Sequence, residues 1–479
     1  MPALEGFVNG SYETQSKVVA GEETINLFPE AVPQGGTAKS ALWPIPGTVD
    51  FGTVSESPGR GAFTHDGRCF AVFGRTLYEF DSAGTGTNRG TLATDANPAT
   101  FDTNGDGGGE LMITSGGAGY ILDLTTNVLT TPLSSGSTMC GQLDGFLISL
   151  NAATSTIRIS DSLDGQTWSG TQIIQRTDAS DPWIAMIVQR SEVYAFGDKT
   201  GSVLYNSGAS PFPLAVRPEG FFSVGCASAF SLAKFMGGIA WLGRTEAGNP
   251  AVYRMEGYTP VKISTPGLDW LIQGYAEAVG IDDAIGWSYE REGHAFYVLS
   301  FPSSDRTYVY DGTTQKWHRR AYYDTATGQW MEYRPLFHTH CFDKNLVLDS
   351  DGAKMYAFSS TTYTDVGGTE LRRVRQMPHV RSDNKRIYFG ASELECDRGI
   401  GVTAGQGSDP EVGLQVSNDN GNTWGVSRMR KVGKIGEYAT RVRWEQGGSG
   451  RGRQWRLWSS DPAPTRWFEF FFTAEVGLH

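Results

Sequence analysis

The stretch GAFTHDGRCFAVFGRTLYEFD, residues Gly61–Asp81, is the clearest indication of how this chain folds. It reads as an apolar strand, a polar turn, a second apolar strand, a short hairpin and an aromatic-rich strand that ends in Asp81. A small sheet of such strands cannot bury both of its faces by itself. The stretch therefore predicts one unit of a repeated, all-β structure.

Similar units follow along the chain. Their closing aromatic strands fall near residues 80, 122, 158, 204, 253, 309 and 356. This spacing of roughly 40–55 residues is typical of the blades of a β-propeller, in which stacking around an axis buries the sheet faces. The pattern predicts a β-propeller over residues 58–365 and leaves six or seven blades open. Helical periodicity is nearly absent; Thr265–Ala278 is one short candidate.

Two segments lie outside the repeat. Residues 1–57 are punctuated by proline, which predicts an extended N-terminal arm. Residues 366–479 contain two candidate hairpins, at Glu411–Gly433 and Ala439–Ser460, with alternating apolar residues. We expect this last segment to form a C-terminal β-sandwich.

The composition supports this division. The chain has 479 residues, of which 61 are glycine, a density that indicates many tight turns. Its net charge is −12, which disfavours tight binding of nucleic acid. The charge is uneven: residues 366–479 hold 17 Lys and Arg against 13 Asp and Glu, and the remainder holds 23 against 39. Such asymmetry suggests two units with different neighbours.

The five cysteines are scattered and form no CxxC pair, so we expect reduced thiols in the core. The start of the chain lacks the charged and apolar regions of a secretory signal, and no apolar run is long enough to span a membrane. These features predict a protein made in a cytosol-like compartment.

The segment Ser417–Trp424 reads S-x-D-x-G-x-T-W, the pattern of the Asp-box turn of sialidase-type propellers. In such a turn the Asp419 carboxylate accepts backbone N–H bonds, Gly421 adopts positive φ, and Trp424 packs under the hairpin; Ser417 and Thr423 complete the pattern. Glycoside hydrolysis needs two carboxylates across a cleft, which the turn does not supply. We therefore interpret it, and the shorter copy at Ser162–Trp168, as structural.

Candidate metal sites are weak, and the predicted cofactor set is empty. His338 and His340 share one face of a predicted strand, with Cys341 on the other, but no second ligand pair has zinc spacing. Phe101–Glu110 resembles a calcium loop. If Asp102 is position 1 of an EF-hand loop, Gly107 stands at position 6 as required, but position 12, which should be glutamate, is Ile113. No metal, catalytic residue or small-molecule substrate is predicted.

A basic run begins the last segment. Its cations could contact phosphate or a protein partner, and the sequence leaves both open: Arg372, Arg373, Arg375, Arg381, Lys385 and Arg386.

The N-terminal third carries a resemblance to a known family. Asn26-Leu27-Phe28-Pro29-Glu30, then Pro46-Gly47, then Arg60-Gly61 before the first hairpin are similar to the start of the tail hub, or nozzle, proteins of short-tailed bacteriophages, also called packaged-DNA stabilisation proteins. The stretch from Leu414 to Gly448 resembles that family's C-terminal strand, turn and basic Trp-bearing segment.

The resemblance implies a non-enzymatic virion protein of the tail, assembled in the host cytoplasm. It implies a homohexameric ring below the portal adaptor that continues the DNA channel, helps to retain the genome and guides its ejection. The implied partners are the adaptor (head–tail connector) protein, a tail needle or plug, and fibre or spike proteins, with transient, non-specific contact to double-stranded DNA. The acidic composition agrees, because a negative wall lets the duplex slide.

Two alternatives stay open. The Asp-box pattern allows a glycan-binding or glycan-cleaving propeller, such as a sialidase-like or receptor-binding tail protein. The stretch Tyr308–Trp317 allows a kelch-like scaffold, although the Gly-Gly pair with Tyr and Trp at fixed offsets does not recur in the blades.

Overall fold

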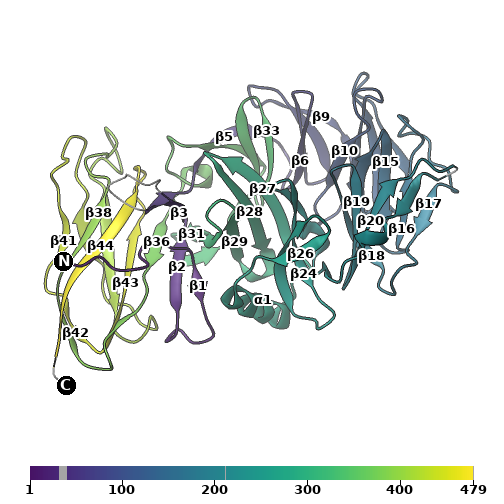
Figure 1. Ribbon diagram of the computed structural model, residues 1–479. Helices are drawn as coiled ribbons and strands as arrows, with labels where there is room; N and C mark the ends of the chain where they lie inside the picture. Colours follow the sequence, from purple (N-terminus) through teal and green to yellow (C-terminus); the bar gives the residue numbers. More distant parts are fainter. Residues whose placement is uncertain (32–39, 211, 478–479) are drawn as a thin grey trace.

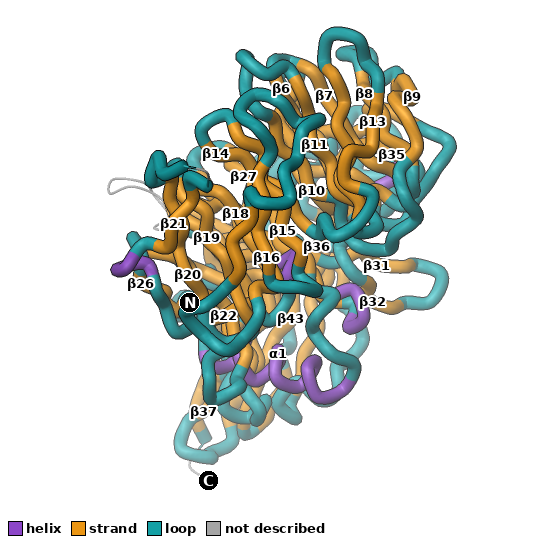
Figure 2. Tube along the Cα trace, turned by 90° about the vertical axis from the view of Figure 1, so that its right-hand side faces the viewer, coloured by secondary structure: helices purple, strands orange, loops and turns teal. Residues whose placement is uncertain are grey.

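The computed structural model describes residues 1–31, 40–210 and 212–477. Within these ranges the chain is almost entirely strand, with one helix of more than one turn (Figure 2). Two β units lie side by side, and the N-terminal strands run between them (Figure 1). The all-β prediction is confirmed.

The larger unit is a propeller. Its first four blades are regular four-stranded antiparallel sheets, each built from consecutive strands. The first blade contains β6 (Gly59–His65), β7 (Arg68–Phe73), β8 (Thr76–Phe80) and β9 (Gly86–Thr91), and the second contains β10 (Thr100–Thr103), β11 (Glu110–Ser115), β12 (Ala118–Asp123) and β13 (Leu129–Leu133). The third contains β14 (Met139–Leu143), β15 (Phe146–Asn151), β16 (Thr156–Ile159) and β17 (Ile173–Gln175). The fourth contains β18 (Trp183–Gln189), β19 (Glu192–Gly197), β20 (Gly201–Asn206) and β21 (Leu214–Val216).

The next two blades are less regular. The fifth contains β22 (Gly225–Cys226), β23 (Ala233–Phe235), β24 (Gly238–Arg244), β25 (Pro250–Glu256) and β26 (Thr259–Lys262), and the sixth contains β27 (Ile285–Arg291), β28 (His294–Phe301), β29 (Arg306–Asp311) and β30 (Lys316–Arg320). Helix α1 (Pro266–Ala278) connects them and begins where the sequence predicts, because the Thr265 side chain accepts a bond from the Leu268 amide and Pro266 fits the first turn.

The seventh blade closes the ring. It consists of β33 (Pro335–Cys341), β34 (Lys344–Asp349), β35 (Lys354–Ser359) and β5 (Gly47–Thr53), and β5 pairs antiparallel with β35. Among the described residues the sheets thus form seven blades. Residues 47–53, which the sequence assigns to the extended arm, supply the outer strand of the last blade. Because β5 directly precedes the first blade, this pairing joins the first and last blades and leaves no unpaired edge on β35.

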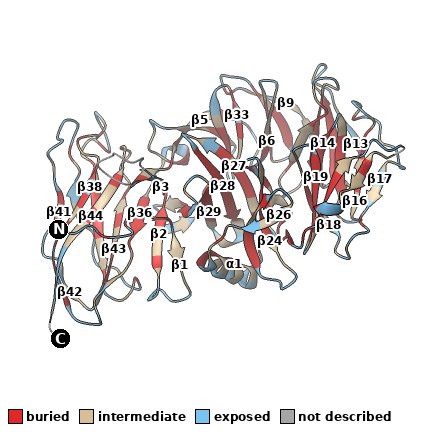
Figure 3. Ribbon diagram, viewed as in Figure 1, coloured by how far each residue is buried: buried red, intermediate tan, exposed pale blue. Residues whose placement is uncertain are grey.

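The aromatic strands predicted near residues 80–356 are the third strands of the seven blades. Their side chains lie between neighbouring sheets; Tyr310 of the sixth blade, for example, packs against Phe235 of the fifth. Buried residues follow the strands of both units (Figure 3).

The smaller unit is a two-sheet sandwich whose sheets both take in N-terminal strands. One sheet contains β3 (Leu27–Ala31), β4 (Ser40–Pro44), β44 (Trp467–Val476), β38 (Ile387–Cys396), β41 (Val442–Trp444) and β42 (Gly448–Gly450). The other contains β1 (Tyr12–Glu13), β2 (Gly21–Ile25), β36 (Arg373–Gln376), β37 (Val380–Arg381), β43 (Gly452–Ser459), β39 (Glu411–Ser417) and β40 (Arg428–Lys431).

The predicted hairpin at Ala439–Ser460 is wrong. Strand β41 pairs with β38 in one sheet, while β43 pairs with β36 and β39 in the other. Trp444 and Trp455 instead meet inside the sandwich core, each about 1% exposed. The alternation of apolar residues identified the buried faces but not the strand partners.

The remaining elements are short. They are the hairpin of β31 (Tyr322–Asp324) and β32 (Gln329–Met331), and the 3-10 turns Pro218–Gly220, Ala229–Ser231, Pro302–Ser304 and Val366–Gly368. None of the helices in the described part of the chain is both long and apolar enough to span a membrane.

Candidate functional site

The junction between propeller and sandwich is built by the motif Asn26–Glu30. Asn26 is fully buried and adopts positive φ (55°). Its side-chain amide donates to the carbonyls of Ala321 and Arg372, both at 2.8 Å, and its side-chain oxygen accepts from the Ala321 amide at 3.0 Å. Asn26 therefore ties the end of the sixth blade to the start of strand β36.

The residues after Asn26 alternate between the two units. Leu27 lies in the sandwich core, whereas Phe28 packs edge-on against His294 and Phe296 of the sixth blade. Strand β2 also pairs in parallel with β30 at Ile25 and Arg319, so one sheet runs from the propeller into the sandwich. The predicted arm is thus an integral part of both units.

Charged groups reinforce the junction. The His294 ring bonds to Asp311 through Nδ1 at 2.8 Å and to Glu30 through Nε2 at 2.6 Å. Burial opposes protonation of His294, but the hydrogen bonds and charges of the two carboxylates outweigh it and raise its pKa to about 9. Next to it, Arg319 pairs with Glu23 of β2 at 2.6 Å.

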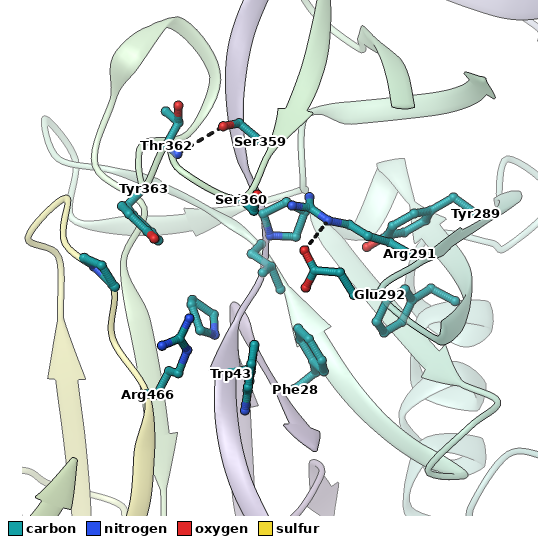
Figure 4. Close-up of a pocket in the computed structure, with 15 residues that line it drawn as sticks. Phe28, Trp43, Tyr289, Arg291, Glu292, Ser359, Ser360, Thr362, Tyr363 and Arg466 are labelled. Atoms are coloured by element: carbon teal, nitrogen blue, oxygen red, sulfur yellow. Dashed lines mark hydrogen bonds and ion pairs between the residues drawn. The ribbon is translucent and has the colours of Figure 1, made fainter. Parts of the chain in front are cut away.

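A hollow of about 180 Å³ opens beside this junction (Figure 4). Its walls are mainly aromatic side chains and prolines, and the Arg466 guanidinium stacks on Trp43 at 4.5 Å. Of the described residues lining it, Glu292 is the one carboxylate, and it pairs with Arg291 at 3.2 Å. The two opposed carboxylates of a glycosidase are therefore not present in this hollow.

The Asp-box turn connects β39 and β40 in the sandwich. Asp419 accepts from the Thr423 amide (2.9 Å) and hydroxyl (2.5 Å), and from the Ser417 hydroxyl (2.6 Å). These bonds lower the pKa of Asp419 to about 2. Gly421 has φ 81°, and Trp424 stacks under the Arg456 guanidinium at 3.9 Å. Among the described residues, all partners of the Asp419 carboxylate belong to the turn itself, so its geometry is that of a hairpin staple.

The shorter copy staples two blades together. Asp164 accepts from the Gln166 amide and the Thr167 hydroxyl, while the Gly165 amide donates to Glu110 of the second blade at 2.6 Å. Glu110 is held in turn by Asn104, from the stretch that resembles a calcium loop. The Asn104 side chain, a candidate ligand in the calcium-loop pattern, is thus engaged in a hydrogen bond to Glu110.

The other metal candidates are separated. His338 bonds to Asn345 at 2.9 Å, His340 is exposed, and the buried Cys341 thiol points to the Gly67 carbonyl. Across the described ranges, no three His, Cys, Asp or Glu side chains gather as metal ligands would. All five cysteines are buried free thiols.

The basic run divides into an inner and an outer half. Arg373 and Arg375 are fully buried: Arg375 donates to the carbonyls of Gly6, Phe7 and Gly10 and pairs with Glu22 at 2.8 Å, and Arg373 donates to the Tyr363 and Asp461 carbonyls. Arg372 is stacked between Tyr323 and Trp458, at 4.3 Å from each ring.

Arg381, Lys385 and Arg386, by contrast, are exposed. This outer half presents its charge to solvent, whereas Arg372 is half-buried. The split follows burial: all four residues of β36, which lies between β2 and β43, are buried, whereas residues 383–386 after β37 are exposed.

Two family models match the chain, one for each unit. Residues 6–363 match the model described as bacteriophage P22 Gp10, beta-propeller, and residues 372–475 match bacteriophage P22 Gp10, beta-sandwich. The chain belongs to the bacteriophage P22 Gp10 family. The resemblance to tail hub proteins is therefore confirmed, and the protein is a bacteriophage tail component with a β-propeller and a β-sandwich.

Similarity to individual proteins is low. No curated protein matches the chain. Among solved structures, the computationally designed Ika8 protein is 12% identical (74% of this chain, 98% of that chain, TM-score 0.38), and the N-terminal domain of Nup159 is 10% identical (71% and 100%, TM-score 0.39). An exo-beta-1,3-galactanase from Phanerochaete chrysosporium is 9% identical (90% and 99%, TM-score 0.28). At these TM-scores the likenesses support no statement about activity.

Proposed function

We propose that this tail protein forms a ring of six copies below the portal adaptor, where it continues the DNA channel, helps to retain the packaged genome and guides its ejection. The observation that carries the proposal is the match of both units to the Gp10 family models, over residues 6–363 and 372–475. The proposed partners are the adaptor, the tail needle or plug, and fibre or spike proteins. Assembly would take place in the host cytoplasm.

The physical character of the chain supports a conduit. The part outside residues 366–479 holds 23 basic against 39 acidic residues, and a negative wall repels phosphate so that DNA passes without being gripped. The continuous sheet through β30 and β2 joins the two units, which suits a part that must withstand the pressure of a packaged genome.

We also propose that the protein is not an enzyme. Neither the junction hollow nor the Asp-box turn presents a carboxylate pair suited to glycoside hydrolysis. A fluorogenic sialoside assay together with a glycan array checks this proposal. Turnover or specific binding in either would favour the glycan-active alternative.

A depletion experiment tests the genome-retention role. Phage grown without this protein should package DNA into heads but lose it after lysis, so that nuclease treatment removes most of the genome from purified particles. Adding back the purified protein should restore nuclease protection. Particles that keep their DNA without the protein would contradict the proposal.

A further inference from the structure

A polar hollow of about 410 Å³ lies at the end of the sandwich that carries the Asp-box turn. Four segments meet around it: the loop before β2, the turn after β37, the Asp-box turn and the start of β43. The lining side chains are rich in hydrogen-bond donors, and none of the described ones is a carboxylate: Val18, Arg381, Asn384, Asn418, Asn420 and Arg451, with Gly452.

The two arginines are held by neutral acceptors. Arg381 donates to the side-chain oxygen of Asn420, and Arg451 donates to the backbone carbonyl of Asn384 at 2.7 Å. Within the described ranges, neither guanidinium lies within 4.0 Å of a carboxylate, and the same holds for Lys385 and Arg386 in the adjoining turn. Four cations therefore gather here without a salt-bridge partner among the described residues, although Asp383 and Asp419 lie in the adjoining turns.

A third arginine orients the floor of the hollow. Arg453 is 2% exposed and pairs with no carboxylate among the described residues, and burial lowers its pKa to about 10. It donates through Nε and Nη2 to the side-chain oxygen of Asn418, both at 3.1 Å. An arginine only donates, so the Asn418 oxygen must face it and the amide nitrogen of Asn418 is left to donate elsewhere. The buried Arg453 guanidinium thus fixes the orientation of the Asn418 amide, whose N–H groups remain available as donors at the hollow.

We infer that this hollow binds carboxylate side chains of a neighbouring copy of the same protein, between Arg381 and Arg451. The inference rests on the proposed ring. Forked guanidinium groups match carboxylates geometrically, and arginine is enriched in the centres of protein interfaces. The complementary surface is the acidic part of the chain outside residues 366–479. A contact between different surfaces of successive copies is the kind that closes a ring.

The surroundings favour a protein ligand over the DNA backbone. Exposed apolar side chains flank the hollow, with Val18 at 46%, Val19 at 75% and Tyr388 at 54% exposure. Tyr388 pairs with Ser449, two positions before Arg451. Phosphate contacts call for cations and polar donors, whereas apolar and aromatic side chains beside arginine are typical of protein interfaces.

Charge reversal tests the site in the full-length protein. We compare the double variant R381E/R451E with R428E/R430E, a charge reversal elsewhere in the same sandwich; Arg428 and Arg430 donate to the backbone carbonyls of Glu445 and Arg443. Sedimentation velocity at low salt should show self-association of the wild type and of the control. We expect R381E/R451E to associate at least tenfold more weakly.

Cross-linking identifies the contact directly. In an equal mixture of ¹⁴N- and ¹⁵N-labelled protein, a carbodiimide should couple Lys385 to Asp or Glu of the propeller in products that contain both isotopes. A monomeric wild type, unchanged association of R381E/R451E, or coupling of Lys385 only within one chain would overturn the inference.

Two further outcomes are informative. If a short DNA duplex binds the wild type and the control but not R381E/R451E, the ligand is phosphate and the inference is wrong. If R381E/R451E still forms rings on the connector, the site assignment fails while the proposed function stands. Failure of the wild type to form rings there would remove both.

Discussion

The Glu30 carboxylate meets Nε2 of His294 at 2.6 Å and so connects strand β3 of the sandwich to strand β28 of the propeller. Because Asp311 holds the other ring nitrogen, the protonated His294 ring donates one N–H to each of the two carboxylates. The joint between the two units is therefore partly ionic, and its strength depends on pH.

The first prediction concerns that dependence. The pKa of His294 is about 6.5 in the unfolded chain and about 9 in the folded protein. Its contribution to stability is therefore complete below pH 6.5 and is lost as the pH rises through 9. The difference in thermal midpoint between wild type and His294→Gln should thus shrink from pH 6 to pH 9.5. The exposed His340→Gln should show no such trend; an unchanged difference for His294→Gln would contradict the assignment.

The second prediction concerns Asn26. Asn26→Ala removes three buried hydrogen bonds and leaves their partners unsatisfied, which should cost about 2–4 kcal/mol in the free energy of unfolding. Asn384→Ala is the matched control, since Asn384 also adopts positive φ (58°) but is exposed. Urea unfolding of both variants measures the difference, and equal losses would mean that only backbone strain matters.

The third prediction concerns closure of the propeller by β5. A Cβ atom at Gly47 would lie 2.2 Å from the Thr362 carbonyl oxygen and 2.8 Å from that of Thr364. Gly47→Ala should therefore push β5 off the last blade and cost about 1–3 kcal/mol. Gly170→Ala should be neutral, because no described atom lies within 4 Å of a Cβ atom at that position. Amide hydrogen exchange of β35 should accelerate only in Gly47→Ala; retained protection there would count against this mode of closure.

The fourth prediction separates the two halves of the basic run. Arg375→Met leaves Glu22 and three carbonyls without their buried partner and should cost about 3–5 kcal/mol. Arg381→Met should change stability by less than about 0.5 kcal/mol, because that side chain is exposed. Chemical unfolding distinguishes them, and similar values for both would refute the division.

Local pattern was enough to predict the blades. Aromatic third strands such as β29 recur at blade spacing because each must fill the space between two sheets. Pairing between distant segments was not predictable in this way. Nothing in Gly47–Thr53 specifies that it pairs with β35, and nothing in Val442–Trp444 specifies which sheet it joins, because strand period fixes the face of a residue but not its neighbour.

The same limit applies to the candidate site. The motif residues Asn26, Phe28, Gly47 and Arg60 indicated the family, and the structure shows why they matter for folding: Arg60, for instance, is 2% exposed and bonds to Gly74 of the first blade and Ser115 of the second. The burial of Arg373 and Arg375 could not be read from charge. Arg373 and Arg375 are two positions apart, on either side of Val374, so they lie on the same face of a strand. This spacing was the one feature of the sequence that could have indicated their shared environment.

Electron cryomicroscopy of the isolated tail bound to its connector is the decisive measurement. We expect a closed ring of copies of this protein immediately below the adaptor, with a lumen wide enough for double-stranded DNA and with propeller and sandwich joined as described. Density that places the protein outside the channel axis, as single copies on a fibre or spike, would contradict it.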